Sequence, residues 1–299
     1  MSYLIRQMGH VVISSPDPEG AAKNLSDVMG VRITGRDGDT VYLSSNDRHH
    51  EVSYVKGNGE AVVLGLEAVS PDAVDEIQSR AKSDGLKILS DSPTGKGYDR
   101  AITLVTPGGA ILEIHTPIKR DQSSRYIGGG GPRPRRLEHV NYLSPDAEGD
   151  TNFYEQLLGM KLSDRTADNV GRWFRAQDGF HHTVALLGAP ELRMHHYAFD
   201  HHSFYDLQRI ADNLDTLGSS LIYGPGRHGA GENLFTYYLD PMGCVVENSI
   251  EMLHISCDAT HEPGVWDISE GLKSRWINKW GTPLPEIFIN SGIPFASVE

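Results

Sequence analysis

The chain has 299 residues, a formal net charge of −13 and two cysteines. The acidic balance argues against nucleic acids and anionic membranes as main partners, and no apolar stretch approaches the roughly 18 residues of a membrane span. Cys244 and Cys257 are too few for a disulfide framework, so we expect both to be small buried residues in a reducing cytoplasm. The N-terminus lacks the charged-then-apolar profile of a signal peptide.

The first part of the chain is repeated in its second part. Met8-Gly-His-Val-Val-Ile-Ser-Ser-Pro-Asp is similar to Leu137-Glu-His-Val-Asn-Tyr-Leu-Ser-Pro-Asp, and each is followed by a helical stretch. The matched residues are His10 with His139, His49-His50 with His181-His182, and Glu113 with Glu247, at offsets from 129 (139 minus 10) to 134 (247 minus 113). Such a small drift in spacing predicts two modules of similar design.

In chain order, the predicted parts are an N-terminal module over residues 1–120, a Gly-rich and basic linker over 121–136, a C-terminal module over 137–254, and a tail over 255–299. Each module reads as two strand–helix–strands units. In the second module we expect a strand at His139, a helix near 149–158, strands up to residue 187, a new strand at 193–199, a helix near 205–217 and strands through 250. We expect Trp266, Trp276 and Trp280 in the tail to pack across the modules or in a subunit contact.

A hairpin is predicted near the end of the second module. Leu234 to Leu239 and Cys244 to Val246 are apolar, aromatic and β-branched, and Asp240-Pro-Met-Gly243 between them is a turn sequence. Glu247 follows the second run, so its carboxylate should be buried or half-buried. A carboxylate in that position requires a cation, a proton or a hydrogen-bond partner.

The two modules differ in their polar residues. The second has His139, His196 and Glu247 at matching points of successive units, whereas the first has His10 and Glu113 but Leu64 where His196 would be. We therefore expect one working site in the second module. His10 and Glu113 are interpreted as a polar pair left by the duplication, since two ligands alone bind iron weakly.

Two imidazoles and one carboxylate on three strands are typical of the facial triad of non-haem Fe(II) oxygenases. Three protein ligands on one face leave the opposite face free for substrate and dioxygen. Structural zinc instead takes four ligands, and neither Cys-x-x-Cys nor His-Glu-x-x-His occurs in the sequence.

The second module also carries a series of motifs in a fixed order. These are Leu137-Glu-His139, Phe180-His-His182-Thr, Met194-His-His196-Tyr-Ala-Phe, Gly226-Arg-His228-Gly, Tyr237 and Asp240-Pro-x-Gly-x-x-x-Glu247. With them the chain resembles, over residues 5 to 285, the type I extradiol ring-cleavage dioxygenases of the vicinal-oxygen-chelate superfamily, related to catechol 2,3-dioxygenases and 2,3-dihydroxybiphenyl 1,2-dioxygenases.

The resemblance implies an α+β fold of two modules, each made of two βαβββ units that form a curved, incomplete mixed barrel with helices outside. It implies Fe(II), with Mn(II) able to accept the same ligands, bound by His139, His196 and Glu247. It further implies His182 as the distal acid–base, His228 and Tyr237 in contact with the diol, a catechol-type substrate cleaved with dioxygen, and a homo-oligomer.

Adjacent histidines on a strand point to opposite faces, so only one of each pair can face the metal. Matching Leu137-Glu-His139 to Met194-His-His196 selects His196, and leaves His195 either facing solvent or supporting a ligand from behind. By the same logic His182, rather than His181, should face the metal. His201 and His202 are interpreted as surface residues.

Two other functions are compatible with the predicted fold. A glyoxalase- or epimerase-like enzyme would use a divalent metal without oxygen, generally with ligands from four equivalent strands and often two carboxylates. A binding module without catalysis would sequester its ligand. The histidine pair at positions 181 and 182 fits ring cleavage better than the first alternative, and His182, His228 and Tyr237 together disfavour the second.

Overall fold

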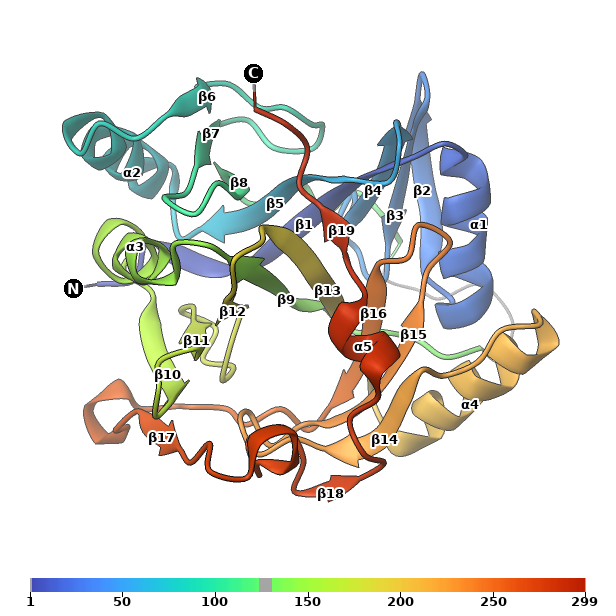
Figure 1. Ribbon diagram of the computed structural model, residues 1–299. Helices are drawn as coiled ribbons and strands as arrows, with labels where there is room; N and C mark the ends of the chain where they lie inside the picture. The colour runs from blue at the N-terminus through green and yellow to red at the C-terminus, as the bar shows by residue number, and fades with distance from the viewer. Residues whose placement is uncertain (1, 124–130, 299) are drawn as a thin grey trace.

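The computed structural model describes residues 2–123 and 131–298, so residues 124–130 of the predicted linker lie outside the described residues. The first module forms an eight-stranded sheet in the order β2-β3-β4-β1-β5-β8-β7-β6 (Figure 1). Its elements are β1 Ile5–Ser15, α1 Pro18–Met29, β2 Arg32–Asp37, β3 Thr40–Ser44, β4 Val52–Lys56, β5 Ala61–Ala68, α2 Pro71–Ser83, β6 Ile88–Ser90, β7 Ala101–Val105 and β8 Ile111–His115.

The second module builds an eleven-stranded sheet together with strands of the tail, along the path β17-β10-β11-β12-β9-β13-β16-β15-β14-β18 with β19 paired to β13. Its elements are β9 Arg136–Ser144, α3 Ala147–Asn152, a π-helical turn Phe153–Leu157, β10 Lys161–Thr166, β11 Gly171–Arg175, β12 Val184–Gly188, β13 Arg193–Asp200, α4 Phe204–Thr216, β14 Tyr223–Arg227, β15 Leu234–Leu239 and β16 Val245–Ile250. The order β-α-β-β-β therefore occurs four times in the described chain. This confirms the predicted α+β fold of paired βαβββ units.

The repeated Ser-Pro-Asp sequence has the same structural role in both modules. Asp17 accepts a hydrogen bond of 3.0 Å from the backbone nitrogen of Gly20, and Asp146 accepts one of 2.9 Å from that of Gly149. Each aspartate thereby satisfies a free amide at the start of a helix. The motif ends the first strand of the unit and begins its helix, which explains why it occurs in both copies.

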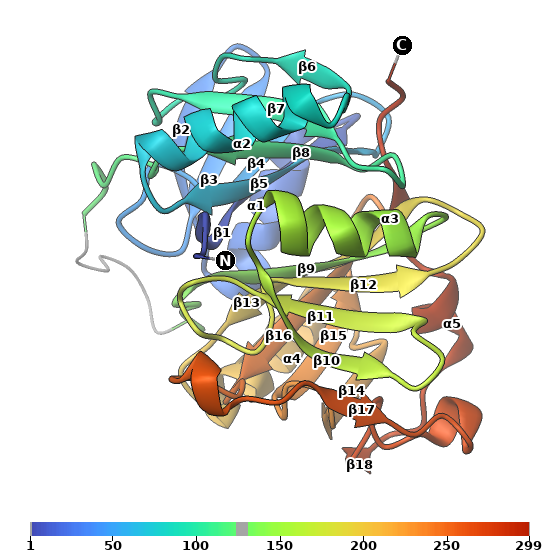
Figure 2. The same cartoon turned by 90° about the vertical axis from the view of Figure 1, so that its left-hand side faces the viewer.

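The helices lie outside the sheets and pair across the modules (Figures 1 and 2). Asn213 of α4 donates a hydrogen bond of 2.9 Å to the carbonyl of Val28 in α1, and Arg80 of α2 donates one of 2.9 Å to the carbonyl of Gln156. One large hydrophobic cluster contains buried residues of both modules, so they share a core. No helix among the described residues has the length and apolar character needed to cross a membrane.

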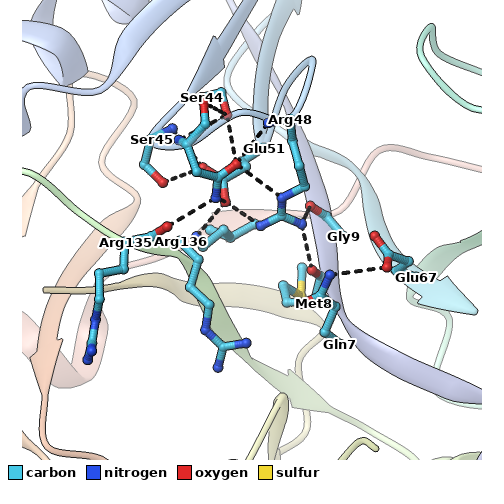
Figure 3. Close-up of polar contacts among 12 residues, drawn as sticks. Gln7, Met8, Gly9, Ser44, Ser45, Arg48, Glu51, Glu67, Arg135 and Arg136 are labelled. Atoms are coloured by element: carbon cyan, nitrogen blue, oxygen red, sulfur yellow. Dashed lines mark hydrogen bonds and ion pairs between the residues drawn. The ribbon is translucent and has the colours of Figure 1, made fainter. Parts of the chain in front are cut away.

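A buried ion pair fastens the first module to β9 (Figure 3). Arg48 and Glu51 contact each other with side chains that are 2% and 0% exposed. The Arg48 guanidinium also donates to the carbonyls of Met8 and Gly9, at 3.1 and 3.2 Å. Glu51 accepts a hydrogen bond of 2.9 Å from the backbone nitrogen of Leu137. A charge pair removed from water needs such additional hydrogen bonds, and here one of them reaches the strand that carries His139.

The tail crosses the second module and returns to the first (Figure 1). It contains short 3₁₀ turns at Asp258–Thr260 and Gly271–Lys273, strands β17 Gly264–Trp266, β18 Trp280–Gly281 and β19 Ile293–Pro294, and helix α5 Glu286–Asn290. These strands pair with β10, β14 and β13 respectively, and Phe295 forms a bridge with Ala61.

Several sequence-based expectations outside the site need correction. Cys244 is buried as expected, but Cys257 is exposed. His202 is exposed as expected, but His201 is fully buried, because it follows the last residue of β13 directly and its backbone bonds to β16. Trp276 does not pack across the modules but against Trp173, at the wall of the cavity described below. The alternative, a subunit contact of the tail tryptophans, stays a prediction.

Candidate metal centre

Three neighbouring strands bring His139, His196 and Glu247 together. The central strand is β13, where Ala198 is paired with His139 of β9 on one side and with Glu247 of β16 on the other. His196 lies two residues before Ala198 and therefore projects from the same face of the sheet. Because the alanine between the two ligands is small, the three side chains converge above it.

The geometry of the three side chains suits one metal ion. The Nε2 atoms of His139 and His196 lie 3.0 and 3.2 Å from the same carboxylate oxygen, Oε2 of Glu247. One candidate ligand atom from each residue lies within 4.8 Å of the others, and all three residues are buried. Within the described residues no other set of three or more His, Cys, Asp or Glu side chains meets this criterion. Two imidazoles and a carboxylate match the donor set of ferrous and manganous sites.

Each ligand is held from behind by a second residue. Oε2 of Glu138 lies 3.1 Å from Nδ1 of His139, and Nδ1 of His195 lies 2.7 Å from Nδ1 of His196. Asn233 donates a hydrogen bond of 2.9 Å to Oε1 of Glu247. Such contacts fix the ring orientation and tautomer of metal ligands. Sequence reasoning missed Glu138 and Asn233, although Glu138 is adjacent to its ligand.

The position of His195 depends on an irregularity in β13. Met194 pairs with Tyr142 and His196 with Asn141, so His195 is the extra residue of a β-bulge. The bulge turns its ring toward His196, and its Nε2 lies 2.7 Å from the carbonyl oxygen of Phe288 in α5. Of the two alternatives predicted for His195, the structure selects contact with a ligand, since the residue is only 4% exposed.

The histidines and carboxylates of the cluster shift one another's pKa values. Burial opposes protonation of His139, but the Glu247 and Glu138 carboxylates outweigh it and raise the pKa of His139 to about 9. Burial lowers the pKa of His196. Burial opposes ionisation of Glu247, yet contact with His139 and His196 holds the pKa of Glu247 well below its usual range. A protonated His139 therefore lies between two carboxylates, those of Glu138 and Glu247, and a divalent cation bound at its Nε2 would take the place of a proton.

A cavity of about 610 Å³ opens on the three ligands and is also lined by His182, His228 and Tyr237. The ring centroids of His182 and His139 are 4.3 Å apart. Burial and the neighbouring His139 lower the pKa of His182 well below its usual value, so its imidazole is neutral. His181 instead lies 3.1 Å from the carboxylate of Asp164. The structure thus directs His182, and not His181, into the cavity.

His228 and Tyr237 form a hydrogen-bonded pair in the cavity wall. Nδ1 of His228 bonds to the carbonyl oxygen of Ile277. Because a carbonyl only accepts, Nδ1 carries the proton, and Nε2 of the neutral ring accepts from the Tyr237 hydroxyl at 2.8 Å. Burial lowers the pKa of His228, and its ring stacks on Phe235 with centroids 3.9 Å apart. The pair therefore has one fixed hydrogen-bond direction.

The first module contains a counterpart of this site. His10 lies 3.4 Å from Glu113, and the rings of His49 and His50 are related by 89°, as are those of His181 and His182. Gly65 pairs with His10 and with Glu113, as Ala198 pairs with His139 and Glu247. His10, His50 and Glu113 are buried, which agrees with a polar pair in the core, whereas His49 is half-buried.

The pairing of Gly65 corrects one assignment made from the sequence. His196 lies two residues before Ala198, and Val63 lies two residues before Gly65. Val63 pairs with Val12 as His196 pairs with Asn141, so the counterpart of His196 is Val63 and not Leu64. Thr94 and Tyr98 donate hydrogen bonds to Glu113, so both oxygens of this carboxylate already have partners within the first module. The first module therefore lacks both the third ligand and a free carboxylate.

Comparison with known proteins agrees with this duplication. Residues 7–114 and 136–247 match the model of the Glyoxalase/Bleomycin resistance protein/Dioxygenase superfamily, and the chain belongs to this superfamily. The match to both parts of the chain reflects the two pairs of βαβββ units.

Similar individual proteins are known both by sequence and by structure. A metapyrocatechase from Geobacillus stearothermophilus is 25% identical over 320 residues, which cover 99% of this chain and 95% of the relative. A manganese-dependent 2,3-dihydroxybiphenyl 1,2-dioxygenase from Geobacillus genomosp. 3 is 26% identical, with 81% of this chain and 83% of the relative covered. The crystal structure of homoprotocatechuate 2,3-dioxygenase from Arthrobacter globiformis aligns with a TM-score of 0.87 at 24% identity, over 99% of this chain and 94% of that one. At this identity the structural likeness shows a shared fold.

Proposed function

We propose that the protein is an extradiol dioxygenase that cleaves the ring of a catechol-type diol beside its two hydroxyl groups. The observation that carries the proposal is the convergence of His139, His196 and Glu247 on one cavity that also contains His182, His228 and Tyr237. In the overall reaction one C–C bond and the O–O bond break, and both oxygen atoms enter the product. The names of the relatives, metapyrocatechase and dihydroxybiphenyl dioxygenase, support this reaction class.

The metal would be held by His139, His196 and Glu247. When bound, a divalent metal would bind the diol and dioxygen together and transmit electron density between them. Iron is our first choice and manganese the second. Relatives named for each metal are known, an iron-dependent extradiol dioxygenase from Rhodococcus jostii and the manganese-dependent enzyme above, and both metals accept this donor set.

His182 would act as the acid–base residue of the reaction. It is buried beside His139, it lines the cavity, and its lowered pKa keeps the ring neutral before the reaction begins. A neutral imidazole can accept a proton from the incoming diol and return it to an oxygen of the opening ring. Its partner His181, 3.1 Å away through Nδ1, holds the ring in place.

His228 and Tyr237 would position the diol. In the structure the Tyr237 hydroxyl donates to Nε2 of His228. A substrate hydroxyl that enters between them can donate to Nε2, and this frees the tyrosine proton to bond to a substrate or dioxygen oxygen. Because both groups are buried and their orientation is set beforehand, such a bond needs little reorganisation.

The test is a reconstitution experiment. The metal-free protein is loaded with Fe(II) or Mn(II) under exclusion of air, a catechol is added, and air is admitted. We expect a yellow ring-opened product, one dioxygen consumed per diol, and both atoms of isotopically labelled dioxygen in the product. Turnover of the diol without dioxygen uptake would contradict the proposal and favour a non-oxygenase metal enzyme of the same fold.

We also propose that the protein is a homo-oligomer, as the resemblance implies, and that it acts in the reducing cytoplasm, as its two cysteines suggest. The number of chains is measured by light scattering coupled to gel filtration of the metal-loaded protein. A mass of one chain at all concentrations would contradict the oligomer.

A further inference from the structure

The cavity is larger than a catechol ring requires. Its volume is about 610 Å³, whereas a protein cavity of about 150 Å³ already binds benzene. The diol-facing residues occupy the inner end, at the metal centre. The remaining space must therefore be filled by a substituent of the substrate or by water.

A large part of the cavity wall is apolar. Trp173 and Trp276 pack edge to face, with ring centroids 5.6 Å apart, and both line the cavity together with Val170 and Leu272. Val170 and Leu272 are 44% and 61% exposed although they are large apolar residues. Exposed apolar side chains that gather at the rim of a pocket are typical of a binding surface for an apolar group.

The opposite wall comes from the C-terminal helix α5. Phe288 contacts Tyr223 and Tyr237, with ring centroids 4.9 and 4.6 Å apart, and Leu284 lies beside it in the same small cluster. Apolar side chains therefore line both sides of the space beyond the diol site.

The charged residues of the cavity offer nothing to an anionic substituent. Apart from the metal ligands and histidines, the charged residues in its described lining are Asp168, Glu191 and Arg193. Arg193 is already engaged: its Nε bonds to Glu191 at 2.8 Å and one terminal nitrogen to the carbonyl of Ile289 at 2.7 Å. Its other terminal nitrogen bonds to the carbonyl of Ser291.

An anionic group in this space would lack a free cationic partner among the described lining residues. It would face two carboxylates and one cation that is already bonded to protein oxygens. Desolvating a charge without a partner is very costly, whereas an apolar substituent gains from burial against the two tryptophans.

We infer that the substrate is a catechol with an uncharged apolar substituent, such as a second aromatic ring or an alkyl chain, that packs against Trp173, Trp276 and Leu272. Carboxylated catechols are excluded as good substrates. The inference rests on the proposed function, since it names the substrate class of the same site.

The test compares phenylcatechol, butylcatechol, unsubstituted catechol and dihydroxyphenylacetate with the Fe(II)- or Mn(II)-loaded protein. We expect kcat/KM for phenylcatechol to exceed that for catechol by about tenfold or more, the effect of a few methylene-sized groups in an apolar pocket. Dihydroxyphenylacetate should fall below catechol. Turnover of dihydroxyphenylacetate as efficient as that of phenylcatechol would overturn the inference and leave the proposed function intact.

A charge-introducing variant adds a second test. Leu272→Lys places a cation at the exposed rim, and we expect the ratio of kcat/KM for phenylcatechol over dihydroxyphenylacetate to fall by about tenfold. Leu89→Lys, on β6 of the first module and also partly exposed, is the matched control and should leave the ratio unchanged. An unchanged ratio in Leu272→Lys would contradict the assigned substituent position.

A binding measurement separates the two proposals. Calorimetry without air measures the affinity of phenylcatechol and dihydroxyphenylacetate for the metal-loaded protein. If no diol is turned over with either metal, the proposed function fails. Tighter binding of phenylcatechol then still supports an apolar ligand site, and equal or weaker binding overturns it.

Discussion

The backbone nitrogen of Leu137 donates a hydrogen bond of 2.9 Å to Oε1 of Glu51, and this contact joins the first module to the strand of the first metal ligand. Leu137 precedes His139 by two residues on β9. Glu51 is itself fixed by Arg48, which is bonded to the carbonyls of Met8 and Gly9 on β1 (Figure 3). The module without a complete metal site thus supports the one that has it.

We expect Glu51→Gln to lower the free energy of unfolding by about 3–5 kcal/mol, because it leaves the buried Arg48 charge without its counterion. Urea unfolding of the metal-free protein measures the change. Glu19→Gln is a suitable control, since it removes an ion pair with Arg36 whose two side chains are more than half exposed, and it should change stability little. Equal effects of both substitutions would contradict a structural role for the buried pair.

The stability contributed by Glu51 should depend on pH. Burial opposes its ionisation, but Arg48 and the hydrogen bonds from Ser45 and Leu137 keep the pKa of Glu51 below its usual value. An acid with a lowered folded pKa contributes stability above its unfolded pKa of about 4.3 and loses it as the pH falls through the folded pKa. The difference in stability between the natural protein and Glu51→Gln should therefore shrink on acidification below about pH 4.3. A difference that stays constant down to pH 2 (roughly the lower end of such titrations) would contradict this.

His182→Phe should separate metal binding from turnover. The phenyl ring fills the space of the imidazole but cannot carry a proton, so we expect unchanged metal content and a fall in kcat of about 100-fold or more. Elemental analysis and a dioxygen-uptake assay measure the two quantities. His50→Phe alters the equivalent buried histidine of the first module and should retain the turnover of the natural protein per folded molecule. Equal kcat values for the two variants would contradict the acid–base role assigned to His182.

His195→Leu should weaken the metal site without removing a ligand. His196 would lose the partner of its Nδ1 atom, and the carbonyl of Phe288 would lose its contact with the site. The loss of such a supporting residue typically costs about 10–100-fold in metal affinity. Competition with a chelator measures the affinity, and His202→Leu at the exposed neighbouring loop serves as the control. Affinities that match in the two variants would show that the contact is not needed.

The sequence determined the features that depend on local order and on repetition. The hairpin around Asp240-Pro-Met-Gly243 was predictable because turn residues separate two apolar runs, and β15 indeed spans Leu234–Leu239. The duplication was visible because both copies need the same Ser-Pro-Asp cap between strand and helix. The duplication and the hairpin pointed to His139 and Glu247, and the match of Leu137-Glu-His139 to Met194-His-His196 added His196 as the third candidate ligand.

Only the tertiary structure decided how distant segments complete the site. The bulge that turns His195 toward His196 arises from the pairing of β13 with β9, and the register that makes Val63 the counterpart of His196 arises from the pairing of β5 with β1. Neither pair of strands is joined by a short turn that would fix its register. The cavity walls from Trp276 and Phe288 lie in a tail outside the repeat. Their positions are set by β17, β18 and β19, which pair with strands about 50 to 100 residues earlier. Local sequence carries no signal for such contacts, because they form only when the chain closes on itself.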